Sequence, residues 1–316
     1  MKTLVATLAT GFVLVYFSEL LFWARLRPDD SLPSWLSTWI AYSLVAFLFL
    51  SAIEYFRVRS LWSLFLAGAL AGWLAEGVIV QTMVEMLPLS ISFTGLAWHA
   101  LISVWVGWYA LRRALLAGWG PTVRLASIIG GGYGFWAICW WSEPDGGIMA
   151  PTGFGLYSLV ATLILIGACW LLDWALAARF SPRRIPLLLV GLLFALWFVL
   201  VAAPTAPAVV VVVPLSLLAL WWGLERNRRR ETRDSLLVAL RGPVPVLHLS
   251  GLLALPATAS AVYTVAHTLQ WRLPTNWLLY LVTTPAGFVL LALAFRQIYH
   301  MKAPVRDLPG TVEPNE

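Results

Sequence analysis

Three polar residues interrupt the otherwise apolar stretch GWLAEGVIVQTMVEMLP, which covers residues 72–88. Glu76, Gln81 and Glu85 lie in a segment long enough to cross a membrane, where each buried charge costs free energy. An ionisable residue inside a membrane helix is by default a candidate for proton or ion chemistry. His99 follows in the next apolar segment and can exchange a proton near neutral pH. These residue types indicate proton or cation chemistry within a membrane.

The depth of these residues follows from a continuous helix that we predict over residues 61–87, running from the inner to the outer side. At about 1.5 Å per residue, Glu76 lies close to mid-membrane, whereas Gln81 and Glu85 lie nearer the outer face. At about 100° per residue, Gln81 and Glu85 share one side of the helix, and Glu76 points to nearly the opposite side. We therefore predict that Glu76 is a proton or ion switch and that Gln81 and Glu85 line an outer vestibule.

His99 returns to the depth of Gln81 from the next span, predicted over residues 93–116. Consecutive helices joined by a short loop usually pack as antiparallel neighbours, so His99 can meet Glu85 or Gln81. A structural role is the alternative, because a membrane histidine also serves to hydrogen-bond a neighbouring helix. A metal site of His99, His267 and Glu85 lacks close ligand spacing, and we predict neither a metal nor a cofactor.

Further polar residues are expected on the outer side. Glu19 falls in the outer half of the first span, and His267 lies near the outer end of the ninth. Both extend the predicted vestibule. An outer loop holds Glu143 and Asp145.

A second candidate feature is the glycine-rich segment SIIGGGYGFWAICWW, residues 127–141. Broken helices at membrane depth usually line a cavity, so this segment is a candidate for a helix break. Close packing is the alternative, since small residues let a neighbouring backbone approach. The glycines concerned are Gly130, Gly131, Gly132 and Gly134.

The elements that carry these residues are membrane helices. Hydrophobic residues make up 60% of the chain and charged residues 11%, which lies outside the range of soluble proteins. Apolar runs of about 18 to 25 residues recur, and each can cross about 30 Å of hydrocarbon. We predict an all-α, polytopic transmembrane bundle of about ten helices in the cytoplasmic membrane of a bacterium or archaeon. The predicted spans are 3–27, 36–56, 61–87, 93–116, 121–142, 153–178, 186–203, 205–224, 247–268 and 276–300.

Arginine and lysine residues predict the orientation. With the N-terminus in the cytoplasm, only Arg25, Arg27 and Arg272 fall on the outer side, so both termini are predicted to be cytoplasmic. The basic loop 225–246 is then cytoplasmic. Its charge run ERNRRRETRD fits a solvated loop that enforces topology, and we expect no nucleic acid partner.

The domain organisation is simple. Residues 1–302 are predicted to form a single transmembrane domain, and residues 303–316, rich in proline and charge, a disordered cytoplasmic tail. Local pairing with arginine explains Glu54 and Asp173 near inner helix ends. Tryptophans near predicted interfaces, including Trp39 and Trp140, are expected to act as interfacial anchors.

Three classes of function remain, because the chain carries no nucleophile elbow, HExxH motif or P-loop. The leading interpretation is a secondary transporter or permease for a polar solute, with Glu76 as switch. The alternative is a membrane-embedded enzyme that acts on a lipid-linked substrate at the outer leaflet, with His99 and an acidic residue as acid and base. The third is a non-catalytic subunit of a membrane complex. Membrane lipids are the partners common to all three.

Overall fold

The computed structural model describes residues 1–143 and 146–301 of the 316-residue chain. These residues form helices and their connections and contain no β-strand. In hydrocarbon every backbone N–H and C=O must find a partner, and a helix provides one within the segment itself. The predicted all-α bundle of membrane helices is confirmed.

Nine helical stretches within the described residues are long and apolar enough to cross a membrane, and each matches a predicted span. The tenth predicted span, 121–142, is also helical, as α7 (Trp119–Ala137) followed by the 3-10 turn η5 (Ile138–Trp141). This span is not among the nine candidate membrane spans because its glycines and Arg124 lower its mean hydropathy. The nine stretches are Lys2–Trp23 (α1, η1, α2), Leu32–Tyr55 (α3), Leu61–Ile79 (α4, η2), Leu89–Ala117 (α5, η4, α6), Pro151–Leu176 (α8), Arg184–Thr205 (α9, η6, α10), Pro207–Arg230 (α11), Val246–Thr268 (α13, η7, α14) and Thr275–His300 (α15).

Serine side chains fix where the helices after the first two loops begin. The Ser31 hydroxyl accepts a hydrogen bond from the Ser34 backbone N–H at 3.3 Å, and the Ser34 hydroxyl accepts one from the Ser31 N–H at 2.8 Å. This reciprocal capping box satisfies N–H groups that the first turn of α3 leaves free. Ser60 caps α4 in the same way, accepting from the Ser63 N–H at 3.1 Å.

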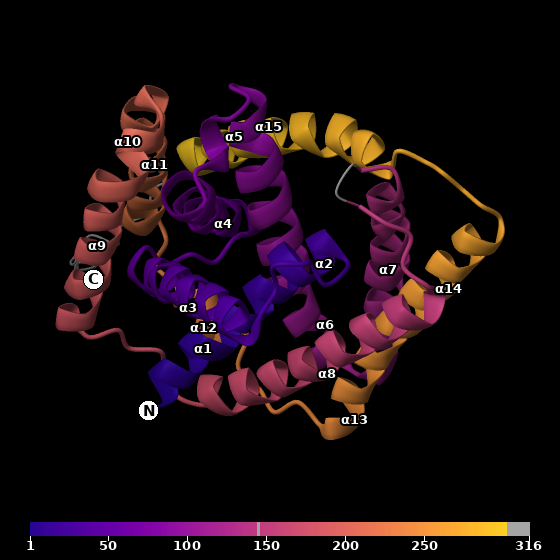
Figure 1. Cartoon of the computed structure of the whole chain (residues 1–316). Helices are drawn as coiled ribbons and strands as arrows, with labels where there is room; N and C mark the ends of the chain where they lie inside the picture. The colour runs from indigo at the N-terminus through magenta and orange to yellow at the C-terminus, as the bar shows by residue number, and fades with distance from the viewer. Residues whose placement is uncertain (144–145, 302–316) are drawn as a thin grey trace, which may run out of the picture.

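The helices pack in an order that places α1 (Lys2–Val15) between α3 and α8 (Figure 1). The helix α4 (Leu61–Leu74) packs along η4 (Phe93–Ala110), and α15 crosses both. On the other side, α7 packs along α14 (Ala254–Thr268). The α9–α11 hairpin forms an outer layer against α3 and α4.

The glycine-rich segment does not break its helix. The α-helix α7 is continuous from Trp119 to Ala137, so the predicted break at Gly130, Gly131, Gly132 and Gly134 is wrong. A Cβ at Gly130 would collide with the Leu255 carbonyl, and one at Gly134 with the Ala259 carbonyl, whereas Gly131 and Gly132 face open space. Two of the four glycines therefore serve close packing of α7 on α14.

A polar network joins the ends of α3, α8 and α11 on the side predicted to be cytoplasmic. Arg179 pairs with Glu54 at 2.8 Å, and the Ser235 hydroxyl donates to the same carboxylate at 2.6 Å. The Asn227 side chain donates to the carbonyls of Phe56 at 2.9 Å and Arg57 at 3.2 Å. The first six residues of the predicted loop 225–246 are thus the last turns of α11, held against the α3–α4 connection.

Two arginine contacts extend this network. Arg112 pairs with Asp173 at 2.7 Å, so the partner of Asp173 comes from another helix and not from a neighbouring arginine in the sequence. Arg233 hydrogen-bonds Glu231 and thereby lowers the pKa of that carboxyl. Lys302, the predicted tail 303–316 and Asp145 lie outside the described residues.

Candidate functional site

The helix that carries Glu76 ends earlier than the sequence predicts. The helix α4 continues only through one π-helical turn, η2 (Ala75–Ile79), and Gln81 follows with left-handed backbone at a φ of 66°. The Gln81 amide donates to the carbonyls of Val78 at 3.1 Å and Ile79 at 2.7 Å, groups that the helix end leaves free. The predicted continuous helix over 61–87 is therefore wrong.

Because the helix ends early, the depth and direction of Glu76 and Glu85 differ from those predicted for a continuous helix. Glu76 lies three residues before the end of the helix, about 5 Å along its axis, and not at the middle of the span. Glu85 lies beyond the helix in an exposed turn. The predicted rotation of about 100° per residue from Glu76 to Glu85 consequently does not apply to this segment.

Glu76 and His99 form the centre of the site. His99 Nε2 lies 2.7 Å from Glu76 Oε1, and the two residues are 4% and 8% exposed. Gly72 permits this approach, because a Cβ there would collide with the Gly95 carbonyl and the His99 Cβ. The predicted contact of His99 with Glu85 or Gln81 is wrong, since His99 meets Glu76, which lies five residues before Gln81 and nine before Glu85.

Two serines extend the pair into a hydrogen-bonded chain. Ser18 Oγ lies 2.9 Å from His99 Nδ1 and 2.8 Å from Ser103 Oγ. At the other end, the Thr82 hydroxyl donates to Glu76 Oε2. An ionised Glu76 can only accept hydrogen bonds, so His99 Nε2 donates to it, and in the tautomer with the proton on Nε2 the His99 Nδ1 accepts from Ser18. The donors then point along the chain toward the Glu76 carboxylate.

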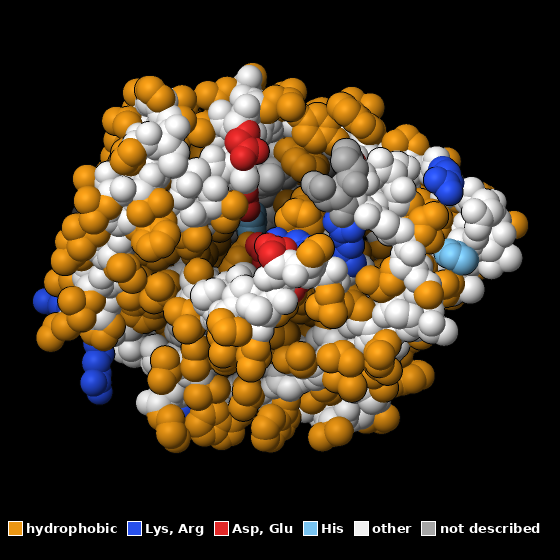
Figure 2. Space-filling model, in the orientation of Figure 1, with side chains coloured by type: hydrophobic (Ala, Val, Ile, Leu, Met, Phe, Trp, Pro, Cys, Tyr) orange, Lys and Arg blue, Asp and Glu red, His pale blue; other side chains and the backbone are white. Residues whose placement is uncertain are grey.

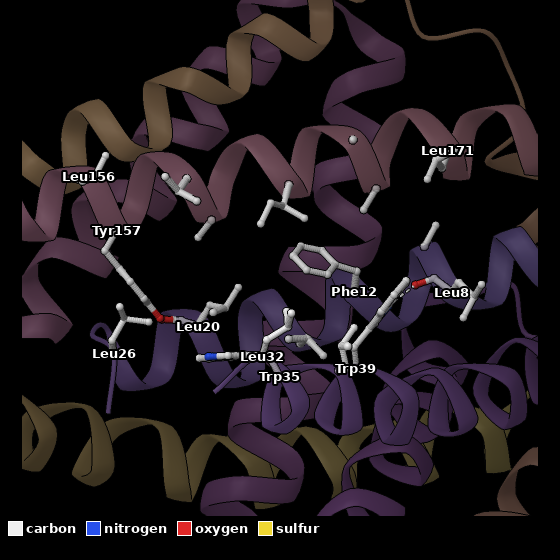
Figure 3. A pocket seen from close by; sticks show the side chains of 18 of the residues that line it. Leu8, Phe12, Leu20, Leu26, Leu32, Trp35, Trp39, Leu156, Tyr157 and Leu171 are labelled. Carbon is white, nitrogen blue, oxygen red and sulfur yellow. Dashed lines mark hydrogen bonds between the residues drawn. The ribbon is translucent and has the colours of Figure 1, made fainter. Parts of the chain in front are cut away.

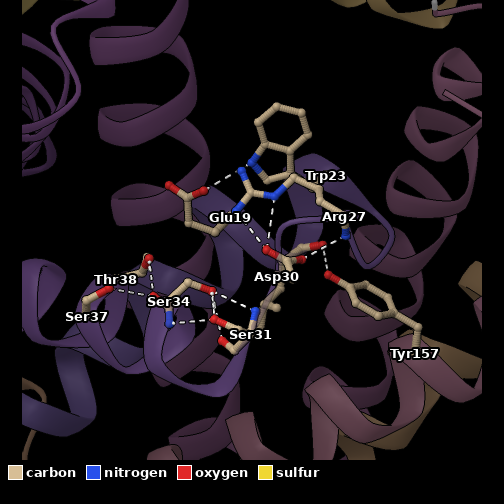
Figure 4. A network of polar contacts seen from close by, with 10 residues as sticks. Glu19, Trp23, Arg27, Asp30, Ser31, Ser34, Ser37, Thr38 and Tyr157 are labelled. Carbon is tan, nitrogen blue, oxygen red and sulfur yellow. Dashed lines mark hydrogen bonds and ion pairs between the residues drawn. The ribbon is translucent and has the colours of Figure 1, made fainter. Parts of the chain in front are cut away.

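A second, partly buried carboxylate lies beside this chain. The Tyr42 hydroxyl donates to Glu19 Oε1 at 2.7 Å, and the Trp23 indole donates to Glu19 Oε2 at 3.2 Å. The Tyr42 ring lies 6.0 Å from the His99 ring between centroids, which brings Glu19 close to the Glu76–His99 pair. Figure 4 shows Glu19 and Trp23 beside the pair that Arg27 forms with Asp30.

Five of these polar residues lie on π-helical segments. Ser18 and Glu19 are on η1 (Tyr16–Leu20), Glu76 is on η2, and His99 and Ser103 are on η4. A π-helical turn shifts the side chains that follow it relative to an α-helix and leaves a backbone carbonyl without its usual donor. Such turns are frequent at functional sites in proteins. The polar chain is thus built where three helices depart from α geometry.

Tryptophan indoles satisfy carbonyls around the first of these segments. Trp98 donates to the Phe17 carbonyl at 3.0 Å, and Trp136 and Trp140 donate to the Phe22 carbonyl at 2.6 and 2.9 Å. Trp39 donates to the Leu8 carbonyl at 2.9 Å in the same manner. Interfacial anchoring is therefore an incomplete account of Trp39 and Trp140, which also hold the backbone of the first helix.

One face of the molecule is hollowed. Figure 2 shows a hollow on this face with acidic, basic and histidine side chains at its walls and floor. Aromatic rings pack beside the polar chain: Phe22 packs edge to face on Trp98 at 4.8 Å, and Trp23 stacks on Trp140 at 5.0 Å. The Arg25 guanidinium lies 5.3 Å from the Trp140 ring.

The remaining predicted vestibule residues do not join the chain. His267 is on α14 and packs on the Trp141 ring at 6.1 Å, away from the helices that carry Glu76. Glu143 accepts from the Asn276 side chain at 2.7 Å and ties its loop to the start of α15. Across residues 1–143 and 146–301, no three His, Cys, Asp or Glu side chains are grouped as a metal site.

Ser18, Ser103 and Tyr42 belong to the site but were not among the sequence candidates. Ser18 directly precedes Glu19, and Ser103 follows His99 by four residues, which is the spacing of side chains on one helix face. These spacings are the only features of the sequence that point to the two serines as members of the site. A lone serine or tyrosine in a membrane helix is otherwise too common to indicate a site.

Comparison with known proteins provides no assignment. The chain matches no protein family, no curated protein and no solved structure.

Proposed function

We propose that this integral membrane protein is a proton-coupled carrier for a polar solute, with the Glu76–His99 pair as the proton switch. The observation that carries the proposal is the 2.7 Å contact between the side chains of two titratable residues, each of which is more than nine-tenths buried. Ionisable groups at such a position in a membrane protein commonly serve as proton relays. A solute that enters the hollow meets this pair at the depth where its protonation can change.

The helix geometry supports movement at this point. Carriers bind their cargo where membrane helices are interrupted, and Glu76, His99 and Ser18 all lie on π-helical turns. On the opposite side, the contacts of Ser235 with Glu54 and of Asn227 with the Phe56 carbonyl hold the inner helix ends together. An open outer hollow with a closed inner side is the arrangement expected of an outward-facing carrier.

The proton step can be described from the chain itself. When Glu76 is ionised, it accepts from His99 and Thr82, and His99 Nδ1 is available to accept from Ser18. A proton taken up by the pair removes the negative charge or adds a positive one beside Glu19. Either change alters the charge that the floor of the hollow presents to a bound solute, which couples proton binding to solute affinity.

The test is a solute uptake screen in cells that express the protein. Wild type should accumulate a polar solute, and a protonophore or the Glu76→Gln variant should abolish accumulation, because both remove the coupled proton. Glu85→Gln is the matched control, since the same change is made on an exposed turn of the same segment. Accumulation that persists in folded Glu76→Gln and in the presence of protonophore would contradict the proposal.

A second candidate function rests on a different feature of the same chain. Ser18, His99 and Glu76 stand in the order of a serine nucleophile, a base and an acidic residue that orients the base. A membrane-embedded hydrolase acting on a lipid-linked substrate at the outer leaflet would use them in this way. A fluorophosphonate probe distinguishes the two functions: labelling of wild type that Ser18→Ala abolishes and Ser103→Ala retains would favour the enzyme.

A non-catalytic subunit is the remaining class. It would show neither uptake nor probe labelling, and it would be expected to copurify with other membrane proteins in a fixed ratio. The predicted orientation is part of the proposal in each case, because the hollow must face outward for a solute or outer-leaflet lipid to enter it.

A further inference from the structure

A long apolar groove lies on a different side of α1 from the polar chain. It has a volume of about 1000 Å³, with α1 as its floor and α3 and α8 as its walls (Figure 3). Phe12, Trp35 and Trp39 contribute aromatic surface, and aliphatic side chains provide most of the rest. The groove is independent of the proposed proton switch, since neither Glu76 nor His99 lines it.

Two residues that line the groove, Tyr157 and Trp39, use their polar atoms to hydrogen-bond the protein backbone. The Tyr157 hydroxyl donates to the Leu20 carbonyl at 3.0 Å, and the Trp39 indole donates to the Leu8 carbonyl at 2.9 Å. Both side chains therefore present carbon to the groove while their donors stabilise the backbone of the first helix. At these two positions an occupant meets carbon and needs no hydrogen-bonding group, which favours hydrocarbon.

The length of the groove distinguishes between hydrocarbon chains. Its α8 wall runs from Gly153 to Leu171, a distance of about 27 Å at 1.5 Å per residue. The hydrocarbon core of a bilayer is about 30 Å thick, so a phospholipid tail reaches only about 15 Å from its own leaflet. A single chain that fills the whole groove has to extend beyond the midplane, whereas phospholipids would fill it only with one tail from each leaflet. Long isoprenoid lipids have such single chains.

Small residues on α8 make this wall concave. Gly153, Ala161, Gly167 and Ala168 face the groove between larger residues. A Cβ at Gly167 would have no protein atom within 4 Å, so the space beside it belongs to the groove and not to a helix contact. A side chain added at Gly167 would occupy the groove without displacing a neighbour.

We propose that this groove binds the chain of a long isoprenoid lipid, extended along α8, with the polar end of the lipid near the α2–α3 connection. Leu26 and Leu32 line the groove at that connection, and Arg27 and Asp30 form an ion pair at 2.9 Å beside it. A polar head would meet charged groups there. At the opposite end Leu171 and Val5 line the groove, and the Lys2 ammonium lies 5.2 Å from the Trp174 ring.

The experiment uses undecaprenyl phosphate as the probe and dioleoyl phosphatidylglycerol as the competitor. Native mass spectrometry of the detergent-purified protein should show one undecaprenyl phosphate retained by wild type in the presence of excess competitor. Gly167→Trp should reduce retention at least about tenfold, a change of roughly 1.4 kcal/mol in binding. Gly132→Trp is the matched control and should retain the lipid, because Gly132 also faces open space but lies on α7, outside the groove.

A second measurement, made on wild type, tests the proposal even if Gly167→Trp folds poorly. A photoactivatable isoprenoid probe should cross-link wild type within the peptide that contains residues 153–171. Equal retention by Gly167→Trp and Gly132→Trp would overturn the proposal, as would cross-links confined to other helices. Displacement of the probe by the phospholipid at equal concentration would also overturn it, because the groove would then not select for chain length.

Discussion

His99 Nε2 and Glu76 Oε1 lie 2.7 Å apart and join η4 to the last turn of the α4–η2 helix. The other nitrogen of the same imidazole lies 2.9 Å from the Ser18 hydroxyl, so one ring links three membrane helices. A buried polar pair of this kind costs desolvation free energy that a purely structural contact between apolar helices would not require. That cost is understandable if the pair changes protonation during function.

The role of His99 is tested by two substitutions that separate titration from hydrogen bonding. In His99→Gln, the amide can contact Glu76 and Ser18, so folded protein should remain abundant while the pH dependence of activity is lost. In His99→Leu, both partners lose a buried hydrogen bond, which should lower the free energy of unfolding by about 1–3 kcal/mol per orphaned group. Thermal unfolding in detergent and activity across pH provide the two readouts. Full pH-dependent activity in His99→Gln would exclude His99 from the switch.

The glycines of α7 should divide into two groups when each is replaced by leucine. Gly130→Leu and Gly134→Leu should destabilise the protein by about 1–3 kcal/mol or more, because the added side chain collides with α14 carbonyls. Gly131→Leu and Gly132→Leu should have little effect, since both positions face open space. Melting temperatures of the four variants measure the difference. Equal effects at all four positions would contradict the packing seen here.

The pair of the buried Arg112 with Asp173 should contribute to stability. Arg112 is 4% exposed and also donates to the carbonyls of Leu240 and Gly242, so its removal takes the ion-pair partner from Asp173 and a donor from each of the two carbonyls. Arg112→Leu should destabilise the protein by about 3–5 kcal/mol, measured by thermal unfolding. Arg179→Leu is the control, because its exposed pair with Glu54 should matter little. An equally mild effect of both variants would refute this difference.

The membrane orientation can be checked by cysteine accessibility. Ser142→Cys should react with an impermeant maleimide in intact cells, because Ser142 is exposed in the loop before α8. Arg229→Cys, exposed at the end of α11, should react only after the cells are permeabilised. A variant lacking Cys139 and Cys169 is the background for both. The reverse pattern would place the hollow on the cytoplasmic side and contradict outward entry.

The sequence predicted the helical membrane fold because that prediction depends on segment length and hydropathy alone. In the described part of the chain nine candidate spans overlap expected ones, although the third ends at Ile79 and not at residue 87. The positions of Glu76 and Glu85 could not be derived in the same way, because they required an unbroken α-helix. The π-helical turn at Glu76 and the left-handed backbone at Gln81 arise from tertiary contacts and local capping, which hydropathy does not detect.

The candidate site was likewise predicted only in part. Glu76, His99 and Glu19 do lie near one another, whereas Gln81 caps a helix and Glu85 and His267 lie elsewhere. The partner of His99 was misassigned because depth was counted along a helix that ends at Ile79. Ser18 and Tyr42 join the site through hydrogen bonds to side chains on other helices, and such contacts produce no periodic pattern in the sequence.

The central claim is that Glu76 binds and releases a proton, and infrared difference spectroscopy of the reconstituted protein tests it most directly. A pH titration of wild type should show a carboxyl C=O band that appears as the pH falls, because the proton neutralises a buried carboxylate. Glu76→Gln should lack this band, while Glu85→Gln should retain it and Glu19→Gln should shift it, since Glu19 lies beside the pair. A titrating band that is unchanged in folded Glu76→Gln would show that Glu76 is a structural hydrogen-bonding residue and would contradict the proposed switch.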